Sequence, residues 1–403
     1  RAAAAGAGKG KAGAQPGSPS LLRRLLGSMC LAAPAGDGDA GAEEEGSPGA
    51  SEEAIEEEEL ASASPDEALA PAADAPPTSP VPMQRDDFTV LSRIGLGFSA
   101  TVYVASRCST DGSDSQLVAL KVVPKRRALD MKIVPLVMRE RAVMGEMRSR
   151  FASRPLGFFQ DDRALYFCLK YAAHGDLFQY LTHASAVSVP TVRFVSACVC
   201  LGLQYLHGKR LVYRDLKPEN VLIGADRYVL LADFGFTKRL APGERAWSIC
   251  TTPDYIAPEL LQRRGSTAAA DVWAFGVFLY ELHAKMSPFH GRTTYELYQH
   301  IATFKRLWFP AGFSAPIKDL TSKLLVRDEL LRLGCSGTAG WGAVQRHSFY
   351  FGLDWAALGR GEVEPPEEFR PSPRDPHRSM PMTHPDWQLQ PVSEAEQEQF
   401  RGF

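Results

Sequence analysis

One stretch is more informative than any other in this 403-residue chain: Tyr213-Arg214-Asp215-Leu216-Lys217-Pro218-Glu219-Asn220. It places a carboxylate, an ammonium group and an amide in a single short loop, with Asp215 and Asn220 five residues apart. In such a loop Asp215 can accept a proton from a hydroxyl, Lys217 can neutralise charge on a transferring phosphoryl group, and Asn220 can hold a metal ion. The alternative interpretation is a charged surface loop.

Two further motifs follow this loop. Asp233-Phe234-Gly235 comes at the end of an apolar stretch that begins at Tyr228, and Ala257-Pro258-Glu259 comes later. We expect Asp233 to bind Mg²⁺, an ion that prefers a few carboxylates together with phosphate oxygens.

A glycine-containing segment lies nearer the N-terminus, and it reads Gly95-Leu96-Gly97-Phe98-Ser99-Ala100-Thr101-Val102. Glycines between two strands let backbone N–H groups close over phosphate oxygens, because no side chain obstructs them. We therefore expect this segment to bind phosphate, with a plain hairpin turn as the alternative.

The run Val118-Ala119-Leu120-Lys121 places a lysine among apolar residues. Burying this charge is costly unless it is used, so we expect Lys121 to act as a cation on the α- and β-phosphates of a nucleotide. Glu140, nineteen residues further on, is the natural partner for Lys121. Pairing with Glu146, the absence of any pair, or an edge lysine that reaches solvent are the alternatives.

The hydrophobic pattern changes along the chain. Strands are expected at 89–94, 101–105 and 117–123, followed by a helix at 135–147. From Leu177 onward the pattern is largely helical, with a long apolar helix at 188–207 and short strands at 221–223 and 229–231. The fold class predicted from this order is α+β, with a small β-rich N-lobe and a larger α-rich C-lobe.

The ordered motifs together resemble the eukaryotic protein kinase family. Tyr213, the phenylalanine after Asp-Phe-Gly and the stretch Trp247-Ser248-Ile249-Cys250 resemble the AGC group, and within it the cyclic-nucleotide-dependent kinases. The resemblance covers roughly residues 88–356 and the C-terminus. It implies the bilobal kinase fold, ATP and Mg²⁺ as cofactors, and phosphorylation of serine or threonine.

Several roles are implied by the resemblance alone. Ser248 stands at the activation-loop phosphorylation site, and Arg214 and Lys238 stand where its phosphate is held. Thr252 stands where a threonine ties the substrate loop to the catalytic aspartate and lysine. The nucleotide pocket and the hinge between the lobes would comprise Leu169, Lys170, Tyr171, Ala172 and Asp176.

The resemblance also implies how substrates and the core are arranged. Asp176, Glu219 and Glu281 stand where basophilic relatives bind arginines that precede the phosphorylated residue; ordinary surface acids are the alternative. Further implied contacts are a buried pair between Glu259 and Arg332, a supporting helix with Asp271-Val272-Trp273 and Gly276, and an apolar stack of Tyr213, Phe234 and Met144. Three departures stand out, at Ala100, Leu136 and Thr251, where the family or its closest members have glycine, histidine and glycine.

Composition divides the chain into three parts. Residues 1–85 are low in complexity with a net charge of −8, whereas residues 86–403 carry +6, so we expect a disordered N-terminal segment. Residues 86–351 are expected to form the kinase domain, and residues 352–403 an AGC-type tail that ends in F-x-x-F (Phe400 to Phe403). That motif would dock beside the helix that carries Glu140.

The seven cysteines include no C-x-x-C pair and favour reduced thiols in a cytoplasmic or nuclear protein. No apolar run is expected to reach membrane-spanning length, so no membrane span is predicted. Residues 1–36 contain four Lys/Arg after Arg1 and no acid, so an organellar transit peptide is the alternative for this segment.

Two classes of function compete. A catalytic kinase would phosphorylate proteins with basic residues before Ser or Thr, and it would respond to an upstream kinase or a separate regulatory subunit. A pseudokinase scaffold or an ATP-binding regulatory protein is the alternative. Pseudokinases typically lose a catalytic residue, whereas this chain retains Lys121, Glu140, Asp215, Asn220 and Asp233. We therefore favour catalysis and expect no nucleic-acid partner.

Overall fold

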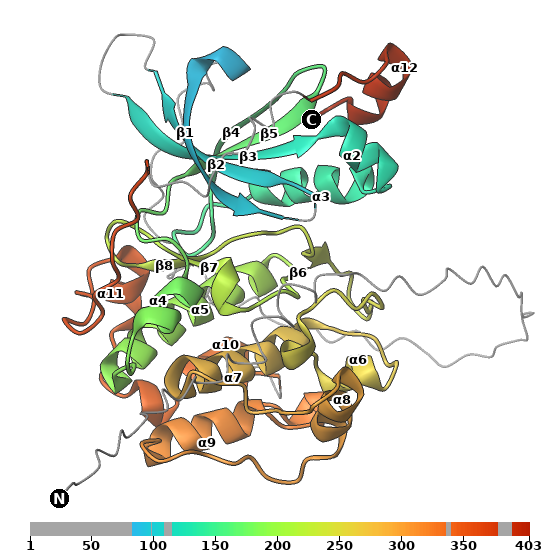
Figure 1. Cartoon of the computed structure of the whole chain (residues 1–403). Helices are drawn as coiled ribbons and strands as arrows, with labels where there is room; N and C mark the ends of the chain where they lie inside the picture. The colour runs from blue at the N-terminus through green and yellow to red at the C-terminus, as the bar shows by residue number, and fades with distance from the viewer. Residues whose placement is uncertain (1–82, 98, 109–114, 336–339, 378–388) are drawn as a thin grey trace, which may run out of the picture.

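The computed structural model describes residues 83–97, 99–108, 115–335, 340–377 and 389–403 (Figure 1). The expectations for residues 1–82, namely disorder or a transit peptide, lie outside these ranges. So does Phe98 of the expected ATP-binding segment.

The N-terminal lobe is built around one antiparallel sheet with the strand order β1-β2-β3-β5-β4. Two helices follow β3 and lie against the sheet (Figure 1). The elements of this lobe are β1 (Phe88–Leu96), β2 (Thr101–Arg107), β3 (Gln116–Pro124), α2 (Lys125–Asp130), α3 (Val134–Gly145), β4 (Pro155–Gln160) and β5 (Ala164–Lys170).

The C-terminal lobe is mainly helical and carries two small two-stranded sheets, β6-β9 and β7-β8. Its elements, with the short helix of the tail, are α4 (Leu177–His183), α5 (Val189–Gly208), β6 (Leu211–Val212), β7 (Val221–Ile223), β8 (Val229–Leu231), β9 (Lys238–Arg239), α6 (Pro258–Leu261), α7 (Ala268–Ala284), α8 (Thr294–Thr303), α9 (Ala315–Leu324), α10 (Gly340–Gln345), α11 (Trp355–Arg360) and α12 (Glu394–Gln397). The predicted bilobal α+β fold is confirmed.

Helix α7 forms the centre of the C-terminal lobe. Thr267 caps its N-terminus by accepting a hydrogen bond from Ala269, and Lys285 ends it in a left-handed conformation. Gly276 allows α9 to approach closely, because a Cβ atom there would lie only 2.8 Å from Leu325 Cδ2. This close packing fixes α7 as the platform on which the catalytic loop rests.

Helix α5 is long and apolar enough to cross a membrane by length and composition. The expectation that no run has this length was therefore wrong. In the structure most of the helix is buried inside the C-terminal lobe, where its apolar residues pack on α7 and β8.

A buried ion pair joins two distant parts of the C-terminal lobe. Arg332 donates to both carboxylate oxygens of Glu259, at 2.8 and 2.6 Å, and both side chains are fully buried. Arg332 also donates to the carbonyl oxygens of Val326 and Ala269, which satisfies more of its hydrogen-bonding capacity. The pair implied by the resemblance is thus confirmed.

The C-terminal segment contacts both lobes (Figure 1). On the C-terminal lobe, the Tyr228 hydroxyl donates to Val363 O and Phe369 packs edge-on against Tyr180. On the N-terminal lobe, Ser92 donates to Pro376 O. Further on, Arg126 of α2 makes two hydrogen bonds to the Glu396 carboxylate, at 2.6 and 2.9 Å.

The two phenylalanines of the terminal motif lie against the N-terminal lobe beside α3. Phe400 is fully buried, and Lys125 Nζ lies 5.1 Å from its ring centroid. Phe403 is partly buried and packs edge-on against Phe167, and the Arg141 guanidinium of α3 lies 5.7 Å from its ring centroid. These contacts connect the tail to the helix that carries Glu140.

We predict that Phe400→Ala lowers both stability and kinase activity. Removing a fully buried phenylalanine leaves a cavity and costs about 3–5 kcal/mol of unfolding free energy. Loss of this support should also loosen α3. Thermal unfolding and kinase assays would test this, with the exposed Arg401→Ala as the control; unchanged melting temperature and activity would rule it out.

Candidate active site

The loop between β6 and β7 holds its polar side chains in a tight cluster. Lys217 Nζ lies 3.1 and 2.9 Å from the two carboxylate oxygens of Asp215. Asn220 Nδ2 donates to the Asp215 carbonyl at 2.8 Å and to its Oδ2 at 2.7 Å. These contacts fix the Asp215 carboxylate, which is only 2% exposed, in one orientation.

The environment of Asp215 favours a proton acceptor. Burial raises its pKa from 3.8 to about 6, although the nearby charge of Lys217 acts in the opposite direction. A carboxylate with a pKa in this range is ionised at neutral pH and is more basic than an exposed aspartate.

Asp271 of α7 holds the start of this loop. Its carboxylate accepts hydrogen bonds from the backbone N–H groups of Tyr213 and Arg214, both at 2.8 Å, and from His207 Nε2 at 2.7 Å. Trp341 Nε1 donates to the other ring nitrogen of His207, which places the histidine proton on Nε2. Arg214 adopts a φ of 68°, a conformation that is unfavourable for residues other than glycine, so the loop needs this support.

A second charged cluster joins the N-terminal lobe to the Asp-Phe-Gly segment. Lys121 Nζ on β3 lies 2.5 Å from Glu140 Oε1 on α3 and 3.4 Å from Asp233 Oδ1. Burial alone would lower the pKa of Lys121, but the charges of Asp233 and Glu140 outweigh it and raise this pKa. The structure therefore selects Glu140 among the partners that the sequence allowed.

Asp233 and Asn220 present oxygen ligands suited to Mg²⁺. The Asp233 side chain is about half exposed, and Lys121 holds its pKa below the usual value. Asn220 uses its Nδ2 for Asp215, which leaves Oδ1 to coordinate. Among the described residues no group of three or more His, Cys, Asp and Glu side chains could hold a metal.

Most of the residues expected to bind ATP lie on or beside β1, β2 and β5. Gly97 N donates to Ala100 O at 2.8 Å and closes the turn between β1 and β2. Ala100 is buried in the core, so its methyl group does not project into solvent. Leu169 and Lys170 end β5 and lead into Tyr171 and Ala172, which connect the two lobes.

The Asp176 carboxylate already has contacts within the protein. Its Oδ1 accepts from Gln179 N at the start of α4, and Arg374 Nη2 of the tail lies 3.8 Å from its Oδ2. Arg374 is anchored nearby, since its N–H donates to Ala173 O at 2.7 Å. Burial raises the pKa of Asp176, and the Arg374 charge acts against this rise.

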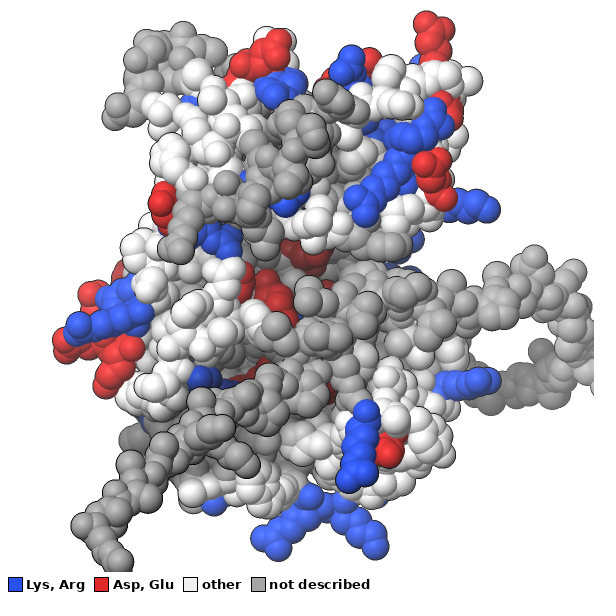
Figure 2. Space-filling view, in the orientation of Figure 1, with Lys and Arg blue, Asp and Glu red and all other residues white. Residues whose placement is uncertain are grey.

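The two other acids expected to bind substrate differ in burial. Glu219 is partly buried on the short helix Pro218–Asn220. Glu281 is only 4% exposed, and it accepts a hydrogen bond from the Tyr255 hydroxyl at 2.5 Å. The alternative interpretation of Glu281 as an ordinary surface acid is thus wrong, because α7 is buried on nearly all sides. Its expected role in substrate binding stays a prediction. Figure 2 shows acidic side chains in the hollow between the lobes.

The activation segment, residues 233–259, carries Ser248. Of the two basic residues expected to hold a phosphate on Ser248, only one contacts its side chain. Arg214 Nη1 donates to Ser248 Oγ at 2.8 Å, whereas Lys238 pairs with Glu244 at 2.8 Å. Thr252 makes no hydrogen bond to Asp215 or Lys217 in the described part of the chain; instead, its carbonyl accepts from Tyr255 N at the start of a short helix. The connection implied by the resemblance is therefore not formed here.

The apolar stack is present behind the site. Tyr213 and Phe234 meet edge to face with ring centroids 5.8 Å apart, and Met144 is buried in the same core cluster. Sequence reasoning missed two contacts beside the site, Arg374 with Asp176 and Arg245 with Glu329. Both join residues far apart in the chain, and no local pattern marks either pair.

Comparison with known proteins agrees with this geometry. Residues 88–347 match the family model described as "Protein kinase domain". The chain is 36% identical over 286 residues to human "Putative 3-phosphoinositide-dependent protein kinase 2", across 70% of this chain and 71% of that protein. It is 34% identical over 299 residues to human "cAMP-dependent protein kinase catalytic subunit PRKX", across 74% of this chain and 81% of that protein.

A third match, to human "3-phosphoinositide-dependent protein kinase 1", is 36% identical and covers 70% of this chain but only 50% of that protein. The chain belongs to the protein kinase family. It is a protein-serine/threonine kinase of the AGC group, which confirms the resemblance, although its relatives include more than the cyclic-nucleotide-dependent kinases.

We predict that Asp271→Asn lowers kcat more than it raises the KM for ATP. The asparagine NH₂ group cannot accept a hydrogen bond, so at least one buried donor loses its partner at a cost of about 1–3 kcal/mol. Steady-state kinetics and thermal unfolding would test this, with Asp319→Asn on α9 as the control. Reduced stability with an unchanged kcat would show that Asp271 does not position the catalytic loop.

Proposed function

We propose that this protein transfers the γ-phosphoryl group of Mg·ATP to serine or threonine in proteins with arginine before the phosphorylated residue. The observation that carries the proposal is the geometry of the site. Asp215, Lys217 and Asn220 form one cluster in the C-terminal lobe, and Lys121 of the N-terminal lobe pairs with Glu140 and reaches Asp233.

Each residue has a defined task in this mechanism. Lys121, oriented by Glu140, would bind the α- and β-phosphates, and Asp233 and Asn220 would hold Mg²⁺, which would supply charge neutralisation at the phosphates. Asp215 orients the substrate hydroxyl and accepts its proton. Lys217, within 3 Å of that carboxylate, stabilises negative charge on the phosphoryl group during transfer.

The proposed substrate preference depends on acids near the site. An arginine fork can bind two carboxylate oxygens, and a carboxylate that lies partly buried favours such a cation. Glu219 is the candidate to test, because it is partly buried on the short helix Pro218–Asn220, four residues after Asp215. The catalytic activity would respond to an upstream kinase acting on Ser248 or to a separate regulatory subunit.

We predict that Asp233→Asn abolishes Mg²⁺-dependent phosphoryl transfer while the protein remains folded. The substitution removes a charged metal ligand from a side chain that is about half exposed, so little packing is lost. Transfer from radiolabelled ATP to basic peptides over a Mg²⁺ titration would test this, with Asp226→Asn as the control. If wild-type protein phosphorylated at Ser248 labels no peptide, the scaffold function replaces the catalytic one.

We predict that Glu219→Gln raises KM for peptides with arginine two and three residues before Ser or Thr far more than it raises KM for ATP. The expected change is about tenfold, which corresponds to the loss of roughly 1.4 kcal/mol in a charge-assisted contact. Glu367→Gln, an exposed change in the tail, is the control. A peptide library that reveals proline-directed or acidic preference would reject the substrate assignment and leave the kinase activity standing.

A further inference from the structure

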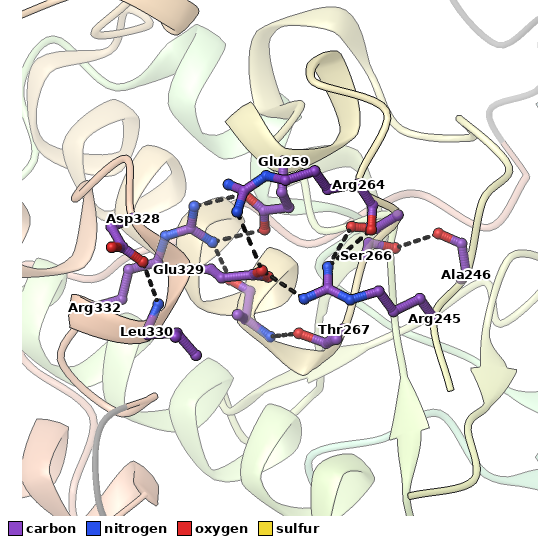
Figure 3. A network of polar contacts seen from close by, with 12 residues as sticks. Arg245, Ala246, Glu259, Arg264, Ser266, Thr267, Asp328, Glu329, Leu330 and Arg332 are labelled. Atoms are coloured by element: carbon purple, nitrogen blue, oxygen red, sulfur yellow. Dashed lines mark hydrogen bonds and ion pairs between the residues drawn. The ribbon is translucent and has the colours of Figure 1, made fainter. Parts of the chain in front are cut away.

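The activation segment is attached to the C-terminal lobe three residues before Ser248. Arg245 Nη1 donates to the carbonyl oxygens of Arg264 and Gly265, both at 3.0 Å, and Arg245 Nη2 lies 2.6 Å from Glu329 Oε1 (Figure 3). One guanidinium group therefore bridges three acceptors on two separate segments.

The partner of Arg245 is a buried charge. The Glu329 side chain is only 5% exposed, whereas the Arg245 side chain is 31% exposed. Arg264 also lies near Glu329, but its Nη1 is 3.9 Å from the same oxygen and its side chain is about half exposed. A buried carboxylate is costly without a close counter-charge, so Glu329 depends mainly on Arg245.

The backbone next to Arg245 strengthens the attachment. Ala246 and Ser266 form an antiparallel bridge, with N–H to O distances of 2.9 and 2.8 Å, and both residues are fully buried. Gly265 allows this approach: its φ is 71°, and a Cβ atom there would lie 3.3 Å from the Trp247 ring. The segment is thus held by side-chain and backbone contacts together.

The other end of the contact is fixed in the core. Glu329 lies three residues before Arg332, whose guanidinium forms the fully buried pair with Glu259 (Figure 3). Asp328 caps the intervening turn by accepting from Leu330 N at 3.0 Å. Arg245 therefore binds to a part of the lobe that has little freedom to move.

Ser248 lies next to this attachment and already contacts Arg214. The two side chains line a small surface pocket together with Ser266 and Asp271. A phosphate on Ser248 would find Arg214 in place, on a loop that Asp271 holds through backbone hydrogen bonds.

We propose that Arg245, through Glu329, is a positioning residue that orders the activation segment before Ser248 is phosphorylated. Phosphorylation of Ser248 then adds contacts to an activation segment that is already ordered. The inference rests on the proposed kinase function for its kinetic consequence. Its structural consequence, an ordered segment around Trp247, can be measured without catalysis.

The experiment compares wild type, Arg245→Ala, Glu329→Gln and the double variant, each with Ser248 unphosphorylated or phosphorylated. Arg360→Ala is the matched control, since Arg360 also forms a 2.6 Å pair, with Glu362, but lies in the tail. Trp247 is 63% exposed, so the rate of chymotrypsin cleavage after Trp247 reports on order in the segment. Steady-state kinetics report on activity, and thermal unfolding verifies that each variant is folded.

We expect Arg245→Ala and Glu329→Gln to accelerate cleavage and to lower kcat of the unphosphorylated enzyme, on the order of tenfold, because misplaced substrate-binding residues slow transfer. Phosphorylation should restore most of both properties. The double variant should differ little from Arg245→Ala, as expected for residues that act through one contact. In the same assay, Ser248→Ala should lower activity without abolishing it.

Several results would overturn the inference. One is cleavage and turnover of Arg245→Ala that match Arg360→Ala in both phosphorylation states. Another is an equal loss of kcat in the unphosphorylated and phosphorylated enzymes, which would show that the role of Arg245 does not depend on phosphorylation of Ser248. Complete absence of phosphoryl transfer by phosphorylated wild type would reject the kinase function instead, and the cleavage rates would still decide the role of Arg245.

Discussion

The buried carboxylate of Asp271 is the constraint on which the active site depends. It accepts hydrogen bonds from two consecutive backbone N–H groups and from His207, and so holds Arg214 at a positive φ. The carboxylate can be buried at low energetic cost because three hydrogen-bond donors face it. Since α7 is packed on most sides, the position of Asp271 is set by the core. Arg214, whose backbone Asp271 holds, donates a hydrogen bond to Ser248 Oγ, so this support extends to the activation segment.

The N-terminal lobe depends on longer-range support. Glu140 must reach Lys121, yet α3 is only twelve residues long and borders the sheet on one side. The tail covers the neighbouring surface with Phe400 and Phe403 and is tied to α2 by the Arg126–Glu396 contact. The two phenylalanines and the Arg126–Glu396 ion pair therefore both support α2 and α3. Placement of the catalytic lysine is in this way linked to a segment more than 200 residues further along the chain.

Local patterns account for what the sequence could predict. The Asp215 cluster lies within five residues, and the strands at 88–96, 101–107 and 116–124 extend the predicted ones by only a few residues. The burial of Glu281 was missed, because an acid in a helix is usually solvated, although the apolar run around it was visible in the sequence. Contacts such as Arg374 with Asp176 were beyond prediction, since charged surface residues carry no pattern and tertiary packing alone decides which of them meet.

Two arginine–glutamate pairs at the base of the activation segment illustrate how such contacts can control a loop. Glu259 and Arg332 are both inaccessible to solvent, whereas in the adjacent pair only Glu329 is buried and Arg245 remains partly exposed. The first pair can break only with disruption of the core, because either partner left alone would be a buried uncompensated charge. The second can open at lower cost, since Arg245 can be hydrated when it leaves and Arg264 remains near the carboxylate. The Glu259–Arg332 pair therefore keeps the lobe folded independently of the activation segment, so loss of the Arg245–Glu329 contact would loosen the segment without unfolding the lobe.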